Sequence, residues 1–266
     1  MDDQGPMRLS EIRLRFHKEL DDNYGKEEVE SFFFILTEYF NQIKRIDLSL
    51  QPEFQIPNAA VPKYDDALVA LKNSKPIQYI AGDTYFYGLR FLVNEDVLIP
   101  RPETEELVDW ILNEIKAGTE KSKLLRLLDI GTGSGCIAIS LAKHMPESEI
   151  VAIDVSDSAL DCAMQNAKLN AVDIEFLQCD ILKESYSFLE AEDHYDIVVS
   201  NPPYVRQSES NEMKSNVLNY EPHLALFVED EDPLQFYKHI ALFAKNNLKD
   251  KGLLFFEINE YLGEEL

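Results

Sequence analysis

The sequence predicts an α/β fold, in which a doubly wound parallel sheet follows a small all-helical N-terminal domain and a β-hairpin linker. From residue 102 onward, short apolar strands alternate with helices, which is typical of a parallel sheet covered on both faces. A glycine-rich turn joins the first of these strands to a helix, and before residue 75 apolar residues recur at helical spacing. We therefore expect a helical bundle at 1–75, a hairpin linker at 76–100 and the α/β domain at 101–266.

The first segment carries apolar residues on two successive helix faces, which are separated at Gly25. The first face is formed by Leu9, Ile12, Phe16 and Leu20, and the second by Val29, Phe32, Phe33, Leu36 and Phe40. Prolines after residue 50 indicate a loop, and a last short helix ends before Pro76. No strand-like alternation interrupts this pattern, so the segment is predicted to be helical throughout.

The linker is rich in aromatic and β-branched residues, which favour strands. Runs at 77–80, 84–87 and 90–93 are separated by glycine-containing turns, which predicts short strands in hairpins. In the α/β segment we expect strands at 124–130, 149–153, 174–178, 196–200 and 253–258, and helices at 103–116, 136–144, 157–170 and 233–248.

The composition narrows the possible functions. The chain has 266 residues and a net charge of −24, and we expect no direct nucleic-acid binding, because that depends on Lys and Arg neutralising phosphates. No apolar run approaches the roughly 20 residues of a membrane span, and the acidic start lacks a secretory core. The spacing of the cysteines Cys136, Cys162 and Cys179 matches no zinc or redox motif. We therefore expect a cytoplasmic protein with no metal site and no contact with membranes.

The clearest motif is the glycine loop at 129–135, Asp-Ile-Gly-Thr-Gly-Ser-Gly, which lies between an apolar strand and a helix. Glycines allow the tight turn and let a ligand approach the backbone closely. The G-x-G-x-G spacing differs from the G-x-G-x-x-G of dinucleotide-binding proteins. The loop resembles motif I of class I S-adenosylmethionine-dependent methyltransferases. Because that ligand is cationic, a carboxylate such as Asp129 is expected beside it.

Two further acidic residues follow the next two strands. Asp154 ends its strand 23 residues after Gly131, where a carboxylate can accept hydrogen bonds from both ribose hydroxyls; the alternative is a helix N-cap. Asp180 follows the third strand and is suited to the adenine amino group, with Ile181 against the ring. The alternative for Asp180 is a residue that caps its own loop.

The tetrapeptide Asn201-Pro202-Pro203-Tyr204 follows the fourth strand. Its prolines fix the loop and remove two backbone donors, so the oxygens of Asn201 and Pro202 are left to accept from a planar NH₂ group. Tyr204 can stack on that plane. The motif resembles the signature of amino-methyltransferases, although alone it could be a structural turn.

Several segments together resemble one family, the release-factor glutamine N5-methyltransferases of the HemK/PrmC type. The matching segments are 76–82, 86–88, 97–105, 129–135, 200–204 and 220–226, and Ile-Pro-Arg-Pro-Glu-Thr-Glu at 99–105 is the most distinctive. The resemblance covers roughly residues 76–260, and the helical first segment agrees in architecture.

The resemblance implies a Rossmann-like class I methyltransferase domain. It further implies methyl transfer from S-adenosylmethionine to the side-chain amide nitrogen of the glutamine in the Gly-Gly-Gln motif of class I peptide-chain release factors. These release factors would be the protein partners, and the helical domain would dock them.

Residue by residue, the resemblance implies a set of cofactor contacts and a set of substrate contacts. The cofactor contacts are Gly131, Thr132, Gly133, Ser134 and Gly135 for methionine, Asp154 for ribose, Asp180 and Ile181 for adenine, and Asn201 beside them. The substrate contacts are Asn201, Pro202, Pro203 and Tyr204, with Asn201, Pro202 and Tyr204 as catalytic residues. Arg101 and Glu103 are expected to be structural.

Other interpretations stay open. An adenine-N6 DNA methyltransferase carries the same tetrapeptide, although the acidity of the chain weighs against it. A binding protein that keeps the fold without activity is a second alternative, and a dehydrogenase is disfavoured by the glycine spacing. Asn259 stands where the family usually has glycine. Because the fold usually closes with a hairpin after its fifth strand, we also expect two strands beyond Leu266.

Overall fold

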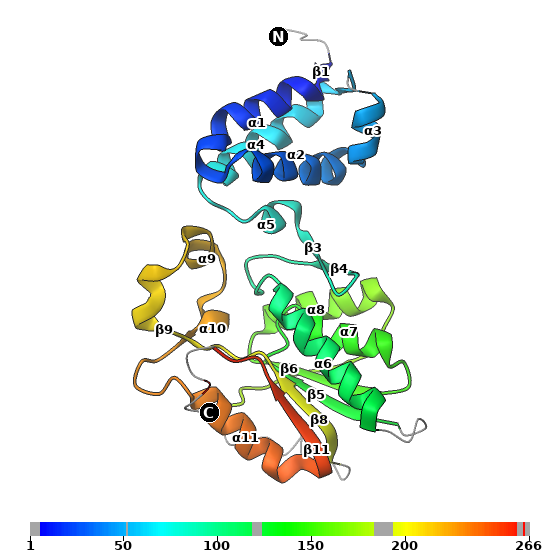
Figure 1. The fold of residues 1–266 in the computed structure, drawn as a ribbon, viewed down its shortest axis with the longest axis vertical. Coiled ribbons are helices and arrows are strands. Elements are labelled where there is room, and N and C mark those ends of the chain that lie inside the picture. The colour runs from blue at the N-terminus through cyan, green and yellow to red at the C-terminus, as the bar shows by residue number, and fades with distance from the viewer. Residues whose placement is uncertain (1–5, 52, 119–123, 184–193, 260–262, 264–266) are drawn as a thin grey trace. The chain divides into compact units, whose positions relative to one another are not determined.

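The computed structural model describes residues 6–51, 53–118, 124–183, 194–259 and 263 (Figure 1). The chain divides into two compact units, Met1–Gly82 and Asp83–Leu266. In the described part of the chain, no helix is both long and apolar enough to cross a membrane.

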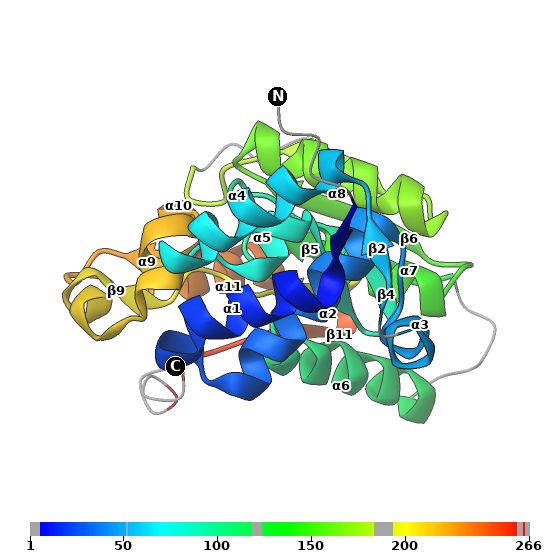
Figure 2. The same cartoon turned by 90° about the horizontal axis from the view of Figure 1, so that it is seen from above.

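The first unit is a helical bundle. Its elements are β1 (Met7–Arg8), α1 (Leu9–Tyr24), α2 (Lys26–Asn41), α3 (Arg45–Leu50), β2 (Gln55–Ile56), a 3₁₀ turn (Asn58–Ala60), α4 (Val61–Lys72) and α5 (Ile77–Ala81). Gly25 separates α1 from α2 at a φ of 80°. Helices α1, α2 and α4 lie side by side and bury Phe16, Phe33 and Tyr64, whose rings meet edge to face (Figure 1 and Figure 2). The sequence does not predict β1 and β2, because strands of two residues carry no alternation.

The strand predicted at 77–80 is wrong, because these residues form helix α5. Gly82 ends the helix in a left-handed conformation, with φ 75°, and its N–H bonds the carbonyl of Gln78. Ile77 is buried in the hydrophobic core of the bundle. Burial against helices therefore outweighs the strand preference of these side chains.

The second unit begins with the hairpin of β3 (Asp83–Phe86) and β4 (Leu89–Leu92). Tyr87 and Gly88 form its two-residue turn, and both have positive φ, 48° and 74°. A type I′ turn requires positive φ at both positions. The Tyr87 backbone N–H donates to the Glu105 carboxylate at 2.6 Å, which holds the tyrosine in this unfavourable conformation.

The central sheet has five parallel strands in the order β11–β8–β5–β6–β7. They are β5 (Arg126–Ile130), β6 (Glu149–Asp154), β7 (Glu175–Gln178), β8 (Tyr195–Ser200) and β11 (Leu248–Phe256). The chain runs outward from β5 to β7 and then returns to β8 on the other side of β5. The carboxyl ends of β5 and β8 therefore flank the point where the strand order reverses, which is where ligands bind in such sheets.

Helices cover both faces of the sheet (Figure 1). The larger ones are α6 (Pro102–Gly118), α7 (Cys136–His144), α8 (Asp157–Asn170) and α11 (Gln235–Asn247). Apolar residues of α6 and α7 pack with Leu127 and Ile197 on one face, whereas those of α11 pack with Leu128 and Val198 on the other. This alternation along the strands confirms the predicted doubly wound, Rossmann-like fold.

A short lobe connects β8 to α11. It consists of β9 (Val205–Arg206), a 3₁₀ helix (Gln207–Glu212), α9 (Ser215–Tyr220), α10 (His223–Leu226) and β10 (Phe227–Val228), with β9 and β10 paired in parallel. The predicted helices at 136–144 and 157–170 match the structure. The last strand begins at Leu248 and not at 253. Leu248 pairs with Tyr195 of β8, and the pairing resumes at Leu253 after an irregularity around Lys251, whose φ is 67°.

Candidate active site

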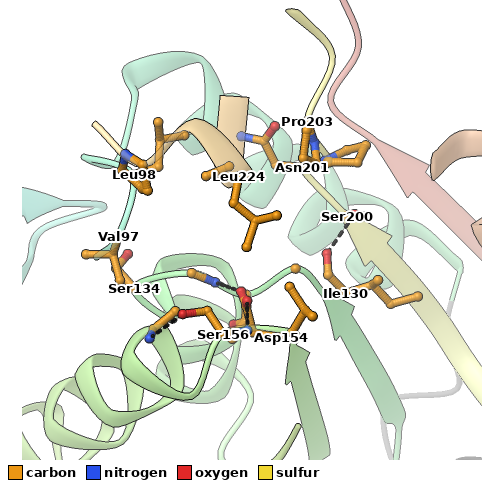
Figure 3. A pocket seen from close by; sticks show the side chains of 18 of the residues that line it. Val97, Leu98, Ile130, Ser134, Asp154, Ser156, Ser200, Asn201, Pro203 and Leu224 are labelled. Atoms are coloured by element: carbon orange, nitrogen blue, oxygen red, sulfur yellow. Dashed lines mark hydrogen bonds between the residues drawn. The ribbon is translucent and has the colours of Figure 1, made fainter. Parts of the chain in front are cut away.

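One cavity lies at the carboxyl ends of β5, β6 and β8. Its described lining is drawn from distant segments: 95–98, 100–101, 104, 130–134, 136–137, 154–156, 158–159, 179–181, 200–203, 222, 224–225, 236 and 240. Asn201 and Pro203 lie on the opposite side of this cavity from Ser134 and Asp154 (Figure 3). The structure therefore brings the glycine loop and the Asn-Pro-Pro segment to one space.

The glycines of the loop have two different roles. Gly133 has φ 55° and open space around its would-be side chain, so its backbone faces the cavity freely. Gly135 has φ 80°, and a Cβ there would lie 2.8 Å from Ile139 Cδ1 and 3.2 Å from Ala163 Cβ. Gly135 is also absent from the cavity lining. It allows α7 and α8 to approach each other, whereas Gly131, Thr132, Gly133 and Ser134 line the cavity.

Asp129 lies beneath the loop and is absent from the cavity lining. It is buried, and its Oδ2 accepts from the Thr132 hydroxyl at 2.7 Å and from the Ala138 backbone N–H at 3.3 Å. Its Oδ1 accepts no hydrogen bond within the described residues. Burial raises the pKa of Asp129 to about 7. Asp129 therefore supports the loop from below, and its nearness to a cationic ligand stays a prediction.

Asp154 faces the cavity and is bound to the loop. Its Oδ2 accepts the Gly133 backbone N–H at 2.8 Å, and its Oδ1 accepts the Ser156 N–H at 3.0 Å. Burial raises its pKa above the usual range. Ser156 is the N-cap of α8, because its Oγ accepts the Ala159 N–H at 3.2 Å. The N-cap alternative for Asp154 is therefore wrong.

Asp180 and Ile181 also line the cavity. The Asp180 carboxylate accepts the Leu182 N–H at 3.1 Å and pairs with Lys183 at 3.0 Å. These bonds are typical of an aspartate that caps its own loop, as the alternative for Asp180 stated. Asp180 also faces the cavity, so its contact with adenine stays a prediction.

The end of β8 is held firmly next to β5. The Ser200 hydroxyl donates to the Ile130 carbonyl at 2.7 Å, and Asn201, Pro202 and Pro203 follow in the lining (Figure 3). Tyr204 is not part of that lining, and its hydroxyl donates to Glu257 Oε1 at 3.4 Å. Burial raises the pKa of Tyr204 to about 12, so its phenol stays neutral.

Sequence reasoning missed two residues that contact Asn201. Thr104, from the first turn of α6, donates its hydroxyl to Glu257 Oε2 at 2.6 Å and accepts from Asn201 Nδ2 at 3.3 Å. Glu257 follows β11, and its carboxylate also bonds the Asn201 side chain. Thr104 lies within the distinctive segment at 99–105, but nothing in that pattern indicates which partner it has.

The sequence and the fold of this chain are similar to those of known proteins. Residues 111–221 match the family model described as methyltransferase small domain. The human methyltransferase 10 domain containing protein is a solved structure that is 23% identical, with a TM-score of 0.42, over 60% of this chain and 65% of that one.

Two curated relatives match almost the entire chain. The release factor glutamine methyltransferase of Flavobacterium psychrophilum is 52% identical over 260 residues, which are 97% of this chain and 89% of that protein. The enzyme of the same name from Bacteroides thetaiotaomicron is 39% identical over 97% of this chain and 90% of its own length. Because this similarity extends over almost the entire chain and most of each relative, the chain belongs to the release factor glutamine methyltransferase family.

Proposed function

We propose that this chain transfers a methyl group from S-adenosylmethionine to the side-chain amide nitrogen of the glutamine in the Gly-Gly-Gln motif of class I peptide-chain release factors. The observation that carries the proposal is the shared cavity, in which the oxygen-bearing Asn201-Pro202 segment lies across from the glycine loop and Asp154. The membership in the family supplies the identity of the substrate.

The chemistry of the lining fits S-adenosylmethionine. Its carboxylates are Glu95, Asp96, Asp154 and Asp180, and Arg101 is the cation among the described lining residues. Arg101 is paired with Glu221. Such a cavity favours a cationic sulfonium ligand over a phosphate-bearing one. Within the described residues no cluster of three metal-ligating side chains occurs, and the proposed reaction involves no metal ion.

Asp154 is suited to the ribose. Its carboxylate accepts backbone hydrogen bonds from Gly133 and Ser156 on different oxygens and from Val155, and it keeps acceptor capacity toward the cavity. Two neighbouring hydroxyls can therefore donate to the two oxygens, while the Gly133 and Ser156 amides hold the carboxylate in place. Ile181 and Val155 add apolar surface beside it for the adenine ring.

The cofactor supplies an electrophilic methyl group on its sulfonium. On the protein side, Asn201 Oδ1 and the Pro202 carbonyl accept the two N–H groups of the glutamine amide. This contact fixes the plane of the amide and directs its nitrogen toward the methyl group. Positive charge grows on that nitrogen as its bond to the methyl carbon forms and the methyl–sulfur bond breaks; the two acceptor dipoles stabilise this charge until one N–H proton is lost to water. Stacking of Tyr204 on the amide stays a prediction.

Mass spectrometry of a release-factor tryptic peptide tests the proposal, with one added methyl on the Gly-Gly-Gln glutamine as the expected result. Methyl label that enters DNA and not the release factor would contradict it. Asn201→Ala should lower kcat by about 10²–10³-fold, by analogy with the loss of one oxyanion-hole donor, and leave cofactor affinity largely intact. Asn113→Ala, which removes an exposed amide on α6, is the matched control.

We also propose that the helical unit docks the release factor and that the reaction takes place in the cytoplasm. A chain without residues 1–72 should bind S-adenosylmethionine like the full chain, which shows that the second unit is folded, but methylate the intact release factor poorly. Full methylation of that factor by the shortened chain would remove the docking role.

A further inference from the structure

Three side chains from separate elements meet at the wall of the cavity. Thr104 comes from the first turn of α6, Asn201 follows β8, and Glu257 follows β11. Thr104 is 2% exposed, and the Glu257 carboxylate receives hydrogen bonds from Thr104, Tyr204 and Asn201. The Tyr237 hydroxyl donates to the Glu257 backbone carbonyl at 3.1 Å, which fixes the position of this glutamate.

With Glu257 ionised, the donors and acceptors of this cluster follow from their chemistry: burial raises the pKa of Glu257, and hydrogen bonds from Thr104, Tyr204 and Asn201 to the ionised form lower it. An ionised carboxylate only accepts hydrogen bonds, so the Thr104 hydroxyl must donate its single hydrogen to Glu257 Oε2, 2.6 Å away. The Thr104 oxygen can then only accept. Asn201 contacts both this oxygen and the carboxylate, so it must present its NH₂ group to them.

The opposite end of the Asn201 amide is therefore its oxygen. Oδ1 accepts no hydrogen bond from the described residues, and Asn201 lines the cavity. A glutamine amide that enters with its own NH₂ group needs an acceptor there. If the Asn201 amide were turned by 180°, two NH₂ groups would face each other and the contact would be lost.

We propose that Glu257 and Thr104 are positioning residues that hold the Asn201 amide with its oxygen toward the substrate and thereby select a substrate that donates N–H bonds. This inference rests on the proposed function for the identity of the substrate. The Glu257 carboxylate only accepts hydrogen bonds, so it orients the Thr104 hydroxyl. The Thr104 oxygen then accepts from the Asn201 NH₂ group and turns the Asn201 oxygen toward the cavity. With Glu257 replaced by glutamine, one acceptor oxygen becomes an NH₂ donor, so Thr104, Tyr204 and Asn201 compete for the single oxygen left and the asparagine is no longer held.

The variants that test this inference keep the shape of the side chains. Thr104→Val and Glu257→Gln should each lower kcat on the intact release factor by at least about tenfold, part of the loss expected for a missing transition-state contact. The KM for the release factor and the calorimetric Kd of S-adenosylmethionine should stay near the wild-type values. Thr104→Ser, which keeps the hydroxyl, should recover most of the lost kcat.

Thr37→Val is the matched control. Thr37 is a fully buried threonine in the helical unit, where its hydroxyl bonds the Phe33 carbonyl. This variant loses a buried hydroxyl in the same way but should keep the wild-type kcat. The inference would be overturned if Thr37→Val and Thr104→Val lost equal factors of kcat, or if Thr104→Val kept the wild-type kcat.

A second measurement is independent of methyl transfer. The ¹⁵N-edited NMR signals of the Asn201 side-chain NH₂, assigned by their loss in Asn201→Asp, should shift in Thr104→Val and Glu257→Gln but not in Thr37→Val. Unchanged signals would overturn the inference. If the wild-type protein did not methylate release factors, the proposed function would fail, while these signals would still show which way Asn201 faces.

Discussion

Arg101 and Glu221 lie 120 residues apart in the sequence, and their side chains form an ion pair at the edge of the cavity. The Glu221 side chain is 1% exposed, whereas that of Arg101 is 32% exposed. One oxygen of Glu221, Oε2, accepts no hydrogen bond in the described part of the chain. The pair therefore joins the segment before α6 to the segment after α9, and the structural role of Arg101 stays a prediction.

Removal of the cation Arg101 should cost more free energy of unfolding than removal of the buried anion Glu221. Arg101→Met leaves a buried carboxylate without compensation and should lower the free energy of unfolding by about 3 kcal/mol. Glu221→Gln removes the buried negative charge itself, so it should lower the free energy of unfolding by only about 1 kcal/mol. Urea unfolding followed by the fluorescence of Trp110, the single tryptophan, reports on the second unit.

Arg90→Met is the control for this comparison, because it breaks an ion pair with Asp83 in which the arginine is 47% exposed. Such a pair contributes at most about 1 kcal/mol. If Arg101→Met lowered the free energy of unfolding no more than Arg90→Met, the unpaired Glu221 carboxylate would not be destabilising, which would contradict this prediction.

Asp129 should make the stability of the second unit depend on pH. Its pKa is about 7 in the folded protein and near 3.8 in a model peptide, so the folded state binds the proton more tightly. Its contribution is fully present below about pH 4 and is lost as the pH rises through 7. Asp129→Asn resembles the protonated form, so the variant should gain stability relative to the wild type between pH 5 and pH 8.

Urea unfolding followed by Trp110 fluorescence at several pH values measures this difference. Asp161→Asn removes an exposed carboxylate on α8 and is the control for net charge. A difference between Asp129→Asn and the wild type that is constant with pH would contradict the raised pKa of Asp129.

Asp154→Asn should weaken the binding of S-adenosylmethionine. An asparagine offers one acceptor oxygen in place of two, so it cannot hold both the Gly133 and Ser156 amides and receive both ribose hydroxyls. Loss of one or two bonds to a charged group corresponds to an increase in Kd of about 10- to 100-fold. Titration calorimetry of this variant beside Asp161→Asn measures the effect, and equal affinities in the two would refute the ribose role.

Alanine at the two loop glycines should separate packing from ligand binding. Gly135→Ala adds a clash with Ile139 and Ala163 to an unfavourable φ, so it should lower the free energy of unfolding by about 3 kcal/mol. Gly133→Ala meets open space and should cost about 1 kcal/mol. Its effect should appear mainly as weaker cofactor binding in the same calorimetric titration. The reverse ranking in stability would contradict the assigned roles.

The parts of the fold that the sequence predicts best are those with local causes. The glycine loop and the helix at 157–170 are defined by residues next to one another, such as Gly133 with its positive φ and Ser156 with its N-cap bond. Residues 77–81 were less predictable, because their side chains favour a strand while burial of Ile77 in the bundle favours a helix.

The candidate site was predictable to the extent that its residues follow strands. Parallel strands end at one edge of a sheet, so Asp154 and Asn201 had to lie near the glycine loop. The contacts of Thr104 with Glu257 join residues 153 positions apart, and no spacing in the sequence indicates such a pair. The position of Asp129 beneath its own loop also became visible only in the structure, because it depends on how the turn folds back onto Thr132 and Ala138.

The long separation between Thr104 and Glu257 also bears on how the protein is made. Domains emerge from the ribosome starting at the N-terminus, so the glycine loop and Asp154 can fold well before the strand that precedes Glu257 is synthesised. Contacts between such distant residues form slowly. Until β11 and the residue after it have been synthesised, the Asn201 amide therefore lacks the Glu257 carboxylate that it contacts.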